Sequence, residues 1–227
     1  CKTFRVELTN PQSRLSRMLE VMYLPFAFCS NFGHFMTETL AFLWPLFSAE
    51  RARLSGRAVL LPGSACSNAC LGLLHTVLRD AHAQPVFENH LPEALFLERV
   101  WVPEPSLRLH AAFSTLHQQT ARAIGDLALD RDPVVRMPTA PGRRLYVSRS
   151  GLEGAVRAVD REQILETLLV QRGWTVFHPQ QHTISEQVAA YRSAAVIAGF
   201  EGSALHGLSW LGVHDCSAKV ILLGDSM

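Results

Sequence analysis

The sequence predicts an α/β protein built on parallel sheets, and its second half carries the clearest signal. Short apolar runs rich in β-branched residues alternate there with longer segments whose apolar residues recur at helical spacing. This alternation is typical of parallel strands joined by crossover helices, as in a Rossmann-like sheet. The composition agrees, because 48% of the 227 residues are hydrophobic and only 18% are charged. Such a chain can bury a sizeable core, and we expect its ligand crevice at the carboxyl ends of the strands.

In the second half, individual residues mark where the elements begin and end. The expected strands are 144–148, 174–177, 195–198 and 219–223, and the expected helices are 160–171, 183–193 and 203–211. Gly173 stands where a glycine commonly ends a helix. Thr183 and Glu186 form the capping-box pattern that starts one.

The first half is expected to be less regular. Residues 1–30 read as an irregular segment with a short apolar stretch at 21–28. A helical pattern follows over 34–54, and Pro45 should kink or split it. The other expected elements are strands at 57–62 and 96–102 and helices at 69–79 and 111–129. Residues 131–142 contain three prolines and Gly142, which predicts a link between two lobes, 1–132 and 143–227.

Charge and cysteine content exclude several classes of protein. The 21 basic and 20 acidic residues give a net charge of +1, unlike a strong nucleic-acid binder. No run of about 18 uncharged apolar residues predicts a membrane-spanning helix. Five cysteines in no regular framework argue against a disulfide-stapled secreted domain, so we expect a cytoplasmic protein, with peripheral association at the inner membrane left open. Cys66, Cys70 and His75 would need further ligands to hold zinc, and buried small side chains are the favoured interpretation.

A glycine turn in residues 196–206 is the most informative segment. An apolar run ends at Gly199, the trio Glu201-Gly202-Ser203 follows, and a helical pattern that includes His206 then begins. Glycines allow a sharp turn, and the first amides of a helix favour an anion such as phosphate. The turn lacks the full dinucleotide fingerprint, and an ordinary strand-to-helix turn is the alternative. The Glu201 carboxylate would repel phosphate and suits ribose or sugar hydroxyls, or an arginine partner.

Two further groups could carry chemistry. Ser148 and Arg149 end an expected strand, and with Arg157 they could present guanidinium groups to a diphosphate. Surface salt bridges with Glu153, Asp160 or Glu162 are the alternative. His34, which closes Asn31-Phe-Gly-His34, lies four residues before Glu38, so both share a helix face. A histidine at a helix start can act as a base, or can be a structural cap or a buried histidine. The spacing is not that of the zinc motif HExxH, and no metal is expected.

The order and spacing of these groups resemble glycosyltransferase family 61. That family includes plant xylan-decorating enzymes, animal O-linked N-acetylglucosaminyltransferases and many bacterial capsular-polysaccharide proteins. The resemblance covers about residues 25–225. The motifs that carry it are Asn31-Phe-Gly-His34, Leu145-Tyr-Val-Ser-Arg149, Arg157, the helix at 160–169, Gly173-Trp-x-Val, Glu186-Gln187-Val188, Ala194-Ala195 and Gly199-x-x-Gly-Ser-Ala-Leu.

The resemblance implies a GT-B-like fold of two Rossmann-like lobes, with the donor held mainly by the second. It implies inverting transfer from a nucleotide-sugar donor to a polysaccharide or glycan acceptor, without a cofactor or bound metal. His34 would be the base or acceptor orienter, with Glu38 beside it. The donor-binding residues would be Asn31, Ser148, Arg149, Arg157, Glu201, Gly202, Ser203 and His206. Such a transfer needs a base and stabilisation of the leaving diphosphate.

Two departures from the family pattern leave an alternative open. Many relatives have a histidine where this chain has Glu201, and Asn-Glu where this chain has Asp160-Arg-Glu162. The alternative is a non-catalytic accessory protein that binds a nucleotide or glycan. An NAD-dependent oxidoreductase is disfavoured, because the glycine pattern is incomplete and no acidic residue clearly takes the ribose position: Asp215 is only 13 residues past Gly202, and Asp225 falls at the end of the given sequence.

Overall fold

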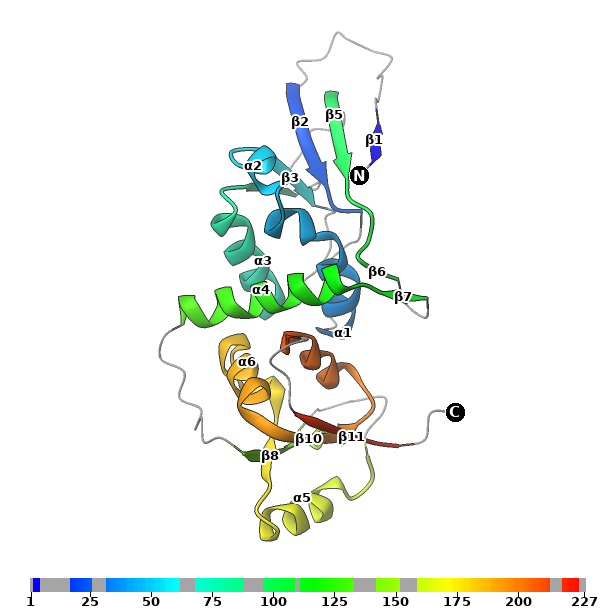
Figure 1. Cartoon of the computed structure of the whole chain (residues 1–227), viewed down its shortest axis with the longest axis vertical. Coiled ribbons are helices and arrows are strands. Elements are labelled where there is room, and N and C mark those ends of the chain that lie inside the picture. Colours follow the sequence, from blue (N-terminus) through cyan, green and yellow to red (C-terminus); the bar gives the residue numbers. More distant parts are fainter. Residues whose placement is uncertain are drawn as a thin grey trace. The chain divides into compact units, whose positions relative to one another are not determined.

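The computed structural model describes residues 2–4, 17–25, 32–61, 68–87, 96–108, 111–132, 142–151, 159–212 and 218–224. The chain forms two compact units, Cys1–Thr120 and Ala121–Met227 (Figure 1). The α/β class expected from the sequence is confirmed, because each unit contains a sheet with four parallel strands. No helix in the described ranges has both the length and the apolar character needed to cross a bilayer.

The sheet of the first unit has five strands in the order β1-β5-β2-β3-β4. Their bounds are Lys2–Phe4 for β1, Arg17–Tyr23 for β2, Ala58–Leu61 for β3, Gln84–Phe87 for β4 and Phe96–Val102 for β5. Strands β5, β2, β3 and β4 are parallel to their neighbours, and β1 is an antiparallel edge strand. All four residues of β3 are buried, as expected for a strand covered on both faces.

The structure of this unit differs from expectation in three places. Residues 1–30, expected to be irregular, contribute β1 and β2, and β4 was not expected at all. Charged residues such as Glu20 interrupt the apolar pattern of β2, so its central place in the sheet is decided by its partners. The helix expected from residue 111 begins later, because Ala112–Phe113 (β7) pairs with Leu107–Arg108 (β6).

The helical stretch expected at 34–54 is broken into short pieces. They are α1 (Phe32–His34), the π-helix η1 (Phe35–Thr39), the 3₁₀ helices η2 (Leu40–Phe42) and η3 (Trp44–Phe47), and α2 (Arg51–Leu54). Pro45 lies in the first turn of η3, which confirms the predicted split. The expected helix at 69–79 is α3 (Asn68–Asp80).

The second unit contains a four-stranded, fully parallel sheet in the order β11-β10-β8-β9. The strands are β8 (Arg143–Val147), β9 (Thr175–Phe177), β10 (Ala194–Phe200) and β11 (Lys219–Leu223). The helices are α5 (Glu162–Gln171), η5 (Pro179–Gln181), α6 (Ile184–Ser193) and η6 (Ser203–Trp210). Helix α5 lies on one face of this sheet, and α6 and η6 lie on the other (Figure 1). The segment expected as an α-helix at 203–211 is the 3₁₀ helix η6.

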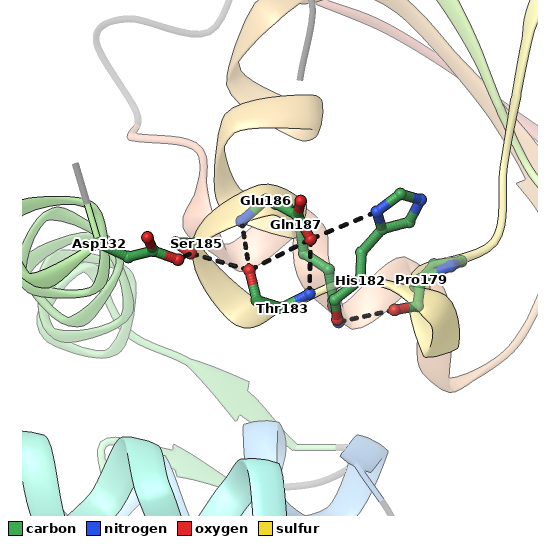
Figure 2. A network of polar contacts seen from close by, with 7 residues as sticks. All are labelled: Asp132, Pro179, His182, Thr183, Ser185, Glu186 and Gln187. Carbon is green, nitrogen blue, oxygen red and sulfur yellow. Dashed lines mark hydrogen bonds and ion pairs between the residues drawn. The ribbon is translucent and has the colours of Figure 1, made fainter. Parts of the chain in front are cut away.

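The predicted helix ends of this unit are confirmed. Gly173 has a φ of +76° directly after the end of α5, where a left-handed conformation is needed. The hydroxyl of Thr183 accepts a hydrogen bond from the Glu186 amide, and the Glu186 carboxylate accepts one from the Thr183 amide at 2.9 Å (Figure 2). The next hydroxyl, on Ser185, donates to Asp132 at 2.6 Å. These contacts fix the start of α6.

Helix α4 (Thr115–Arg131) runs from the first unit into the second. Its later turns are held by Arg192 at the end of α6, which donates to the carbonyl of Arg122 at 3.0 Å and pairs with Asp126 at 2.5 Å. The link expected at 131–142 falls mostly on residues 133–141, outside the described ranges, so that lobe boundary stays a prediction.

Candidate functional site

The strand order of the second sheet predicts a ligand crevice between β8 and β10. The chain passes from β8 to β9 on one side, then crosses to β10 on the other side of β8. Connections that leave neighbouring parallel strands in opposite directions open a ligand crevice at the carboxyl ends of those strands. Val147 is level with Gly199, so the residues after each strand, 148–151 and 201–203, lie at this opening.

Arg149 joins the two sides of this crevice. Its Nη1 donates to the backbone carbonyl of Glu201 at 2.9 Å. Gly202 has a φ of +156°, and a Cβ added there would lie 3.1 Å from the same nitrogen. The guanidinium therefore lies against bare backbone, and only glycine combines this conformation with this close approach. The structure thus brings together three of the predicted donor-site residues.

The side chain of Glu201 is exposed, and the bond from Arg149 goes to its backbone carbonyl rather than to its carboxylate. The sequence left open an arginine partner for this carboxylate. In the structure the backbone carbonyl of Glu201 positions Arg149, and the carboxylate stays exposed at the turn.

Glu162, the first residue of α5, accepts hydrogen bonds from residues at the end of β8. The carboxylate is 1% exposed, and it accepts hydrogen bonds from the Tyr146 hydroxyl at 2.7 Å and from the Arg149 amide at 3.1 Å. Burial, with the bond to Glu162 as the next cause, raises the pKa of Tyr146. One interpretation of the sequence made Glu162 a surface salt-bridge partner of the arginines. The structure gives it a different role, since it binds the backbone of Arg149 and leaves the guanidinium to Glu201.

A second carboxylate on α5, that of Glu166, was not among the site residues predicted from the sequence. Glu166 Oε1 accepts hydrogen bonds from the hydroxyls of Ser148 and Ser150, each at 2.5 Å. The i, i+4 spacing of Glu162 and Glu166 puts both carboxylates on one face of the helix, which is the signal that could have found them. Ser148 is 1% exposed, so its hydroxyl positions the strand end from within the structure.

The remaining predicted donor-site residues belong to the start of η6 or lie outside the described ranges. Ser203 is the exposed first residue of η6, and His206 lies one 3₁₀ turn later and is partly buried. Gly202 therefore opens a helix whose first amides face the end of the turn. Asn31 and Arg157 lie outside the described residues.

In the first unit, His34 and Glu38 form the contact that their spacing predicts. His34 Nδ1 lies 2.8 Å from Glu38 Oε1, and the histidine side chain is 52% exposed. The hydroxyl of Thr37 donates a hydrogen bond to the backbone carbonyl of Gly33 at 2.9 Å. This bond gives a carbonyl of α1 a partner where the chain passes into η1. A single-turn π-helix such as η1 is often found at a functional site.

The weak zinc candidate is only partly visible. Cys70 is buried in α3, and Cys66 lies outside the described residues. Within the described ranges, no three His, Cys, Asp or Glu side chains are grouped so that they could hold a metal ion.

The model of the family described as Glycosyltransferase 61 matches residues 32–219. The match includes both described groups, His34 with Glu38 and Arg149 with the Glu201 turn. A search of curated proteins gave no match.

Proposed function

Since the chain belongs to the glycosyltransferase 61 family, we propose that it moves a sugar, with inversion, from a nucleotide-sugar donor to a polysaccharide or glycan acceptor. Membership in the family makes the chain a glycosyltransferase with a donor and an acceptor substrate. Its α/β fold with two parallel sheets is consistent with a GT-B-like class. The donor type, the acceptor type and the inverting course are the parts that we propose.

The observation that carries the proposal is the position of Arg149 at the crevice between β8 and β10. A guanidinium has five N–H donors in a planar fork, and the bond to Glu201 uses one of them. Such a fork suits the oxygens of a diphosphate. Glu162 fixes the backbone of Arg149 and the bond to Glu201 orients its guanidinium, so the cation is partly ordered before a ligand binds.

The turn at Glu201–Ser203 complements this cation. The amides that open η6 offer further donors to a diphosphate, and the exposed Glu201 carboxylate would accept hydrogen bonds from ribose or sugar hydroxyls. We assign the neutralisation of the leaving diphosphate to Arg149 and these amides, without a bound metal.

We assign the base to His34. Its exposed imidazole can accept the proton of an acceptor hydroxyl, and the contact with Glu38 orients the ring. The acceptor oxygen then forms a bond to the anomeric carbon while the bond from that carbon to the diphosphate oxygen breaks. The electron pair leaves with the nucleoside diphosphate, and attack from the opposite face inverts the anomeric centre.

Thermal unfolding with UDP, GDP, CMP, TDP and NAD tests the donor assignment. A ligand that binds only the folded protein stabilises it by about 2.7 kcal/mol at 100 times its Kd. We expect one nucleoside diphosphate to raise the Tm of the wild type and of Arg172→Ala, a control at an exposed arginine of the same unit. The shift should disappear in Arg149→Ala. If no nucleotide raises the Tm, the donor proposal is wrong and a role as an accessory binding protein takes its place.

A further inference from the structure

The first sheet has a crevice of its own, outside the site assigned to the donor. The chain passes from β2 to β3 on one side, and β5 lies on the other side of β2, so the carboxyl ends of β2 and β5 flank a change in direction. The helical segment at 32–42 comes after β2, and residues 103–108 come after β5. A pocket of about 230 Å³ lies between these two segments.

A buried polar network joins the two segments that flank this pocket. The amide and the hydroxyl of Ser106 both donate to the carbonyl of Ala41, at 2.8 and 3.0 Å. His117 Nδ1 lies 3.1 Å from the same hydroxyl, and both side chains are at least nine-tenths buried. Trp44 adds a bond from Nε1 to the carbonyl of Glu104 at 2.8 Å. These hydrogen bonds therefore hold the segments on the two sides of the pocket together.

The lining of the pocket combines an apolar floor with two charges. Ala41, Phe42, Pro105 and Leu107 supply the apolar surface, and Glu38 and Arg108 are the charged residues. A sugar ring has this dual character, because it presents C–H groups on its faces and hydroxyls around its edge. His34 contacts only Oε1 of Glu38, so a purely apolar ligand would cover this carboxylate without offering a donor to its other oxygen, which is costly. The volume is below the roughly 300–1,000 Å³ of pockets for drug-sized ligands, and so suits one ring.

We propose that this pocket binds a single sugar ring of the acceptor, an inference that rests on the glycosyltransferase function proposed above. The ring packs on Phe42, Pro105 and Leu107, and its hydroxyls donate to Glu38 and accept from Arg108. Glu38 also contacts His34 at 2.8 Å, so a ring bonded to Glu38 lies beside the histidine to which we assign the base. Recognition would then be of one terminal residue of the glycan rather than of an extended chain.

Saturation-transfer NMR with the methyl glycosides of glucose, galactose, xylose and N-acetylglucosamine tests the pocket directly. We expect at least one glycoside to receive saturation from the wild type. Leu107→Trp, which fills the pocket, should abolish the signal, while Leu168→Trp on the exposed face of α5 should keep it. Glu38→Gln should weaken binding about tenfold through the loss of a charged hydrogen bond, and Glu50→Gln should not.

The outcomes separate this inference from the function on which it rests. Nucleotide binding without any glycoside signal, or a signal that persists in Leu107→Trp, overturns the pocket and leaves the donor proposal standing. A pocket-dependent glycoside signal without nucleotide binding supports the pocket and overturns the donor proposal. If Leu107→Trp does not fold, Arg108→Ala at an exposed position replaces it, and an unchanged glycoside signal in that variant overturns the proposal.

Discussion

Arg149 Nη1 donates to the backbone carbonyl of Glu201, a residue 52 positions further along the chain, at 2.9 Å. Arg149 is the second residue after the end of β8 and Glu201 the first after β10, and these strands are neighbours in the sheet. The bond therefore joins the two chain segments that follow these strands. Because the acceptor is a backbone oxygen, the contact depends on the course of the turn and hardly on the side chain at position 201.

Gly202→Ala should disturb this contact and the folded state together. The φ of +156° is costly for alanine, and the added Cβ would press on the Arg149 guanidinium. We expect unfolding in urea to show a loss of about 2 kcal/mol or more, and the nucleotide-induced rise in Tm to vanish. Gly142→Ala is the matched control, because its φ is +86° but nothing lies within 4 Å of the new Cβ. Equal losses in both variants, with nucleotide binding intact, would contradict the role assigned to Gly202.

Glu162→Gln should destabilise the second unit more than Glu166→Gln. In Glu162→Gln the carbonyl can keep the bonds that Oε1 accepts, but the NH₂ then replaces Oε2 and faces the Arg149 amide, which is 3.3 Å from Oε2, and both groups can only donate. Glu166 accepts from two hydroxyls, and these can rotate to accept from a glutamine instead. We expect Glu162→Gln to lower the free energy of unfolding by about 1.5–3 kcal/mol and Glu166→Gln by less than about 1 kcal/mol, as measured by urea unfolding. A larger loss for Glu166→Gln would show that the β8 end depends on the serines instead.

Thr183→Ala should weaken the start of α6. The substitution removes the acceptor for the Glu186 amide and one member of the network that reaches Asp132 through Ser185 (Figure 2). Loss of such a cap costs about 0.5–2 kcal/mol in the free energy of unfolding. Thr183→Ser keeps the hydroxyl and should remain close to the wild type. Equal stability of all three proteins would show that the capping box contributes nothing.

His117 should make the stability of the first unit depend on pH. Burial lowers the pKa of His117 to about 4, with a weaker opposing contribution from the backbone of Met36. Between pH 6.5 and 4 the unfolded chain binds a proton there that the folded chain does not, so the free energy of unfolding should fall as the pH falls through this range. The full loss is on the order of 3 kcal/mol, at about 1.4 kcal/mol for each pKa unit.

Urea unfolding at several pH values measures this effect. His117→Leu removes the titrating group, so the pH dependence between 4 and 6.5 should become shallower. His82→Asn is the control, because this exposed histidine has a φ of +55° that asparagine adopts readily. A slope that is unchanged in His117→Leu, or that is reduced equally in His82→Asn, would assign the pH dependence to other groups.

Much of the second unit could be predicted from the sequence, because its signals are local. Gly173, the Thr183–Glu186 capping box and the alternation of strands and helices each depend on residues a few positions apart. The contact between His34 and Glu38 belongs to the same class, since its i, i+4 spacing fixes it. The strands β1, β2 and β4 could not be predicted in this way. Their places depend on partners far along the chain, and charged or proline residues mask their apolar pattern.

In the candidate site, too, the local features could be predicted from the sequence and the long-range contacts could not. By itself, the sequence determined which residues stand at strand ends and turns, among them Arg149, Glu201 and Gly202, because turn chemistry and periodicity are local properties. Only the tertiary structure decided that β8 lies beside β10, that Arg149 bonds the carbonyl of Glu201, and that Glu162 and Glu166 hold the β8 end from α5. The pocket beside Glu38 likewise exists only because residues after β5 return to Ala41. These contacts join residues that are distant in sequence, and strand order and side-chain packing bring such residues together.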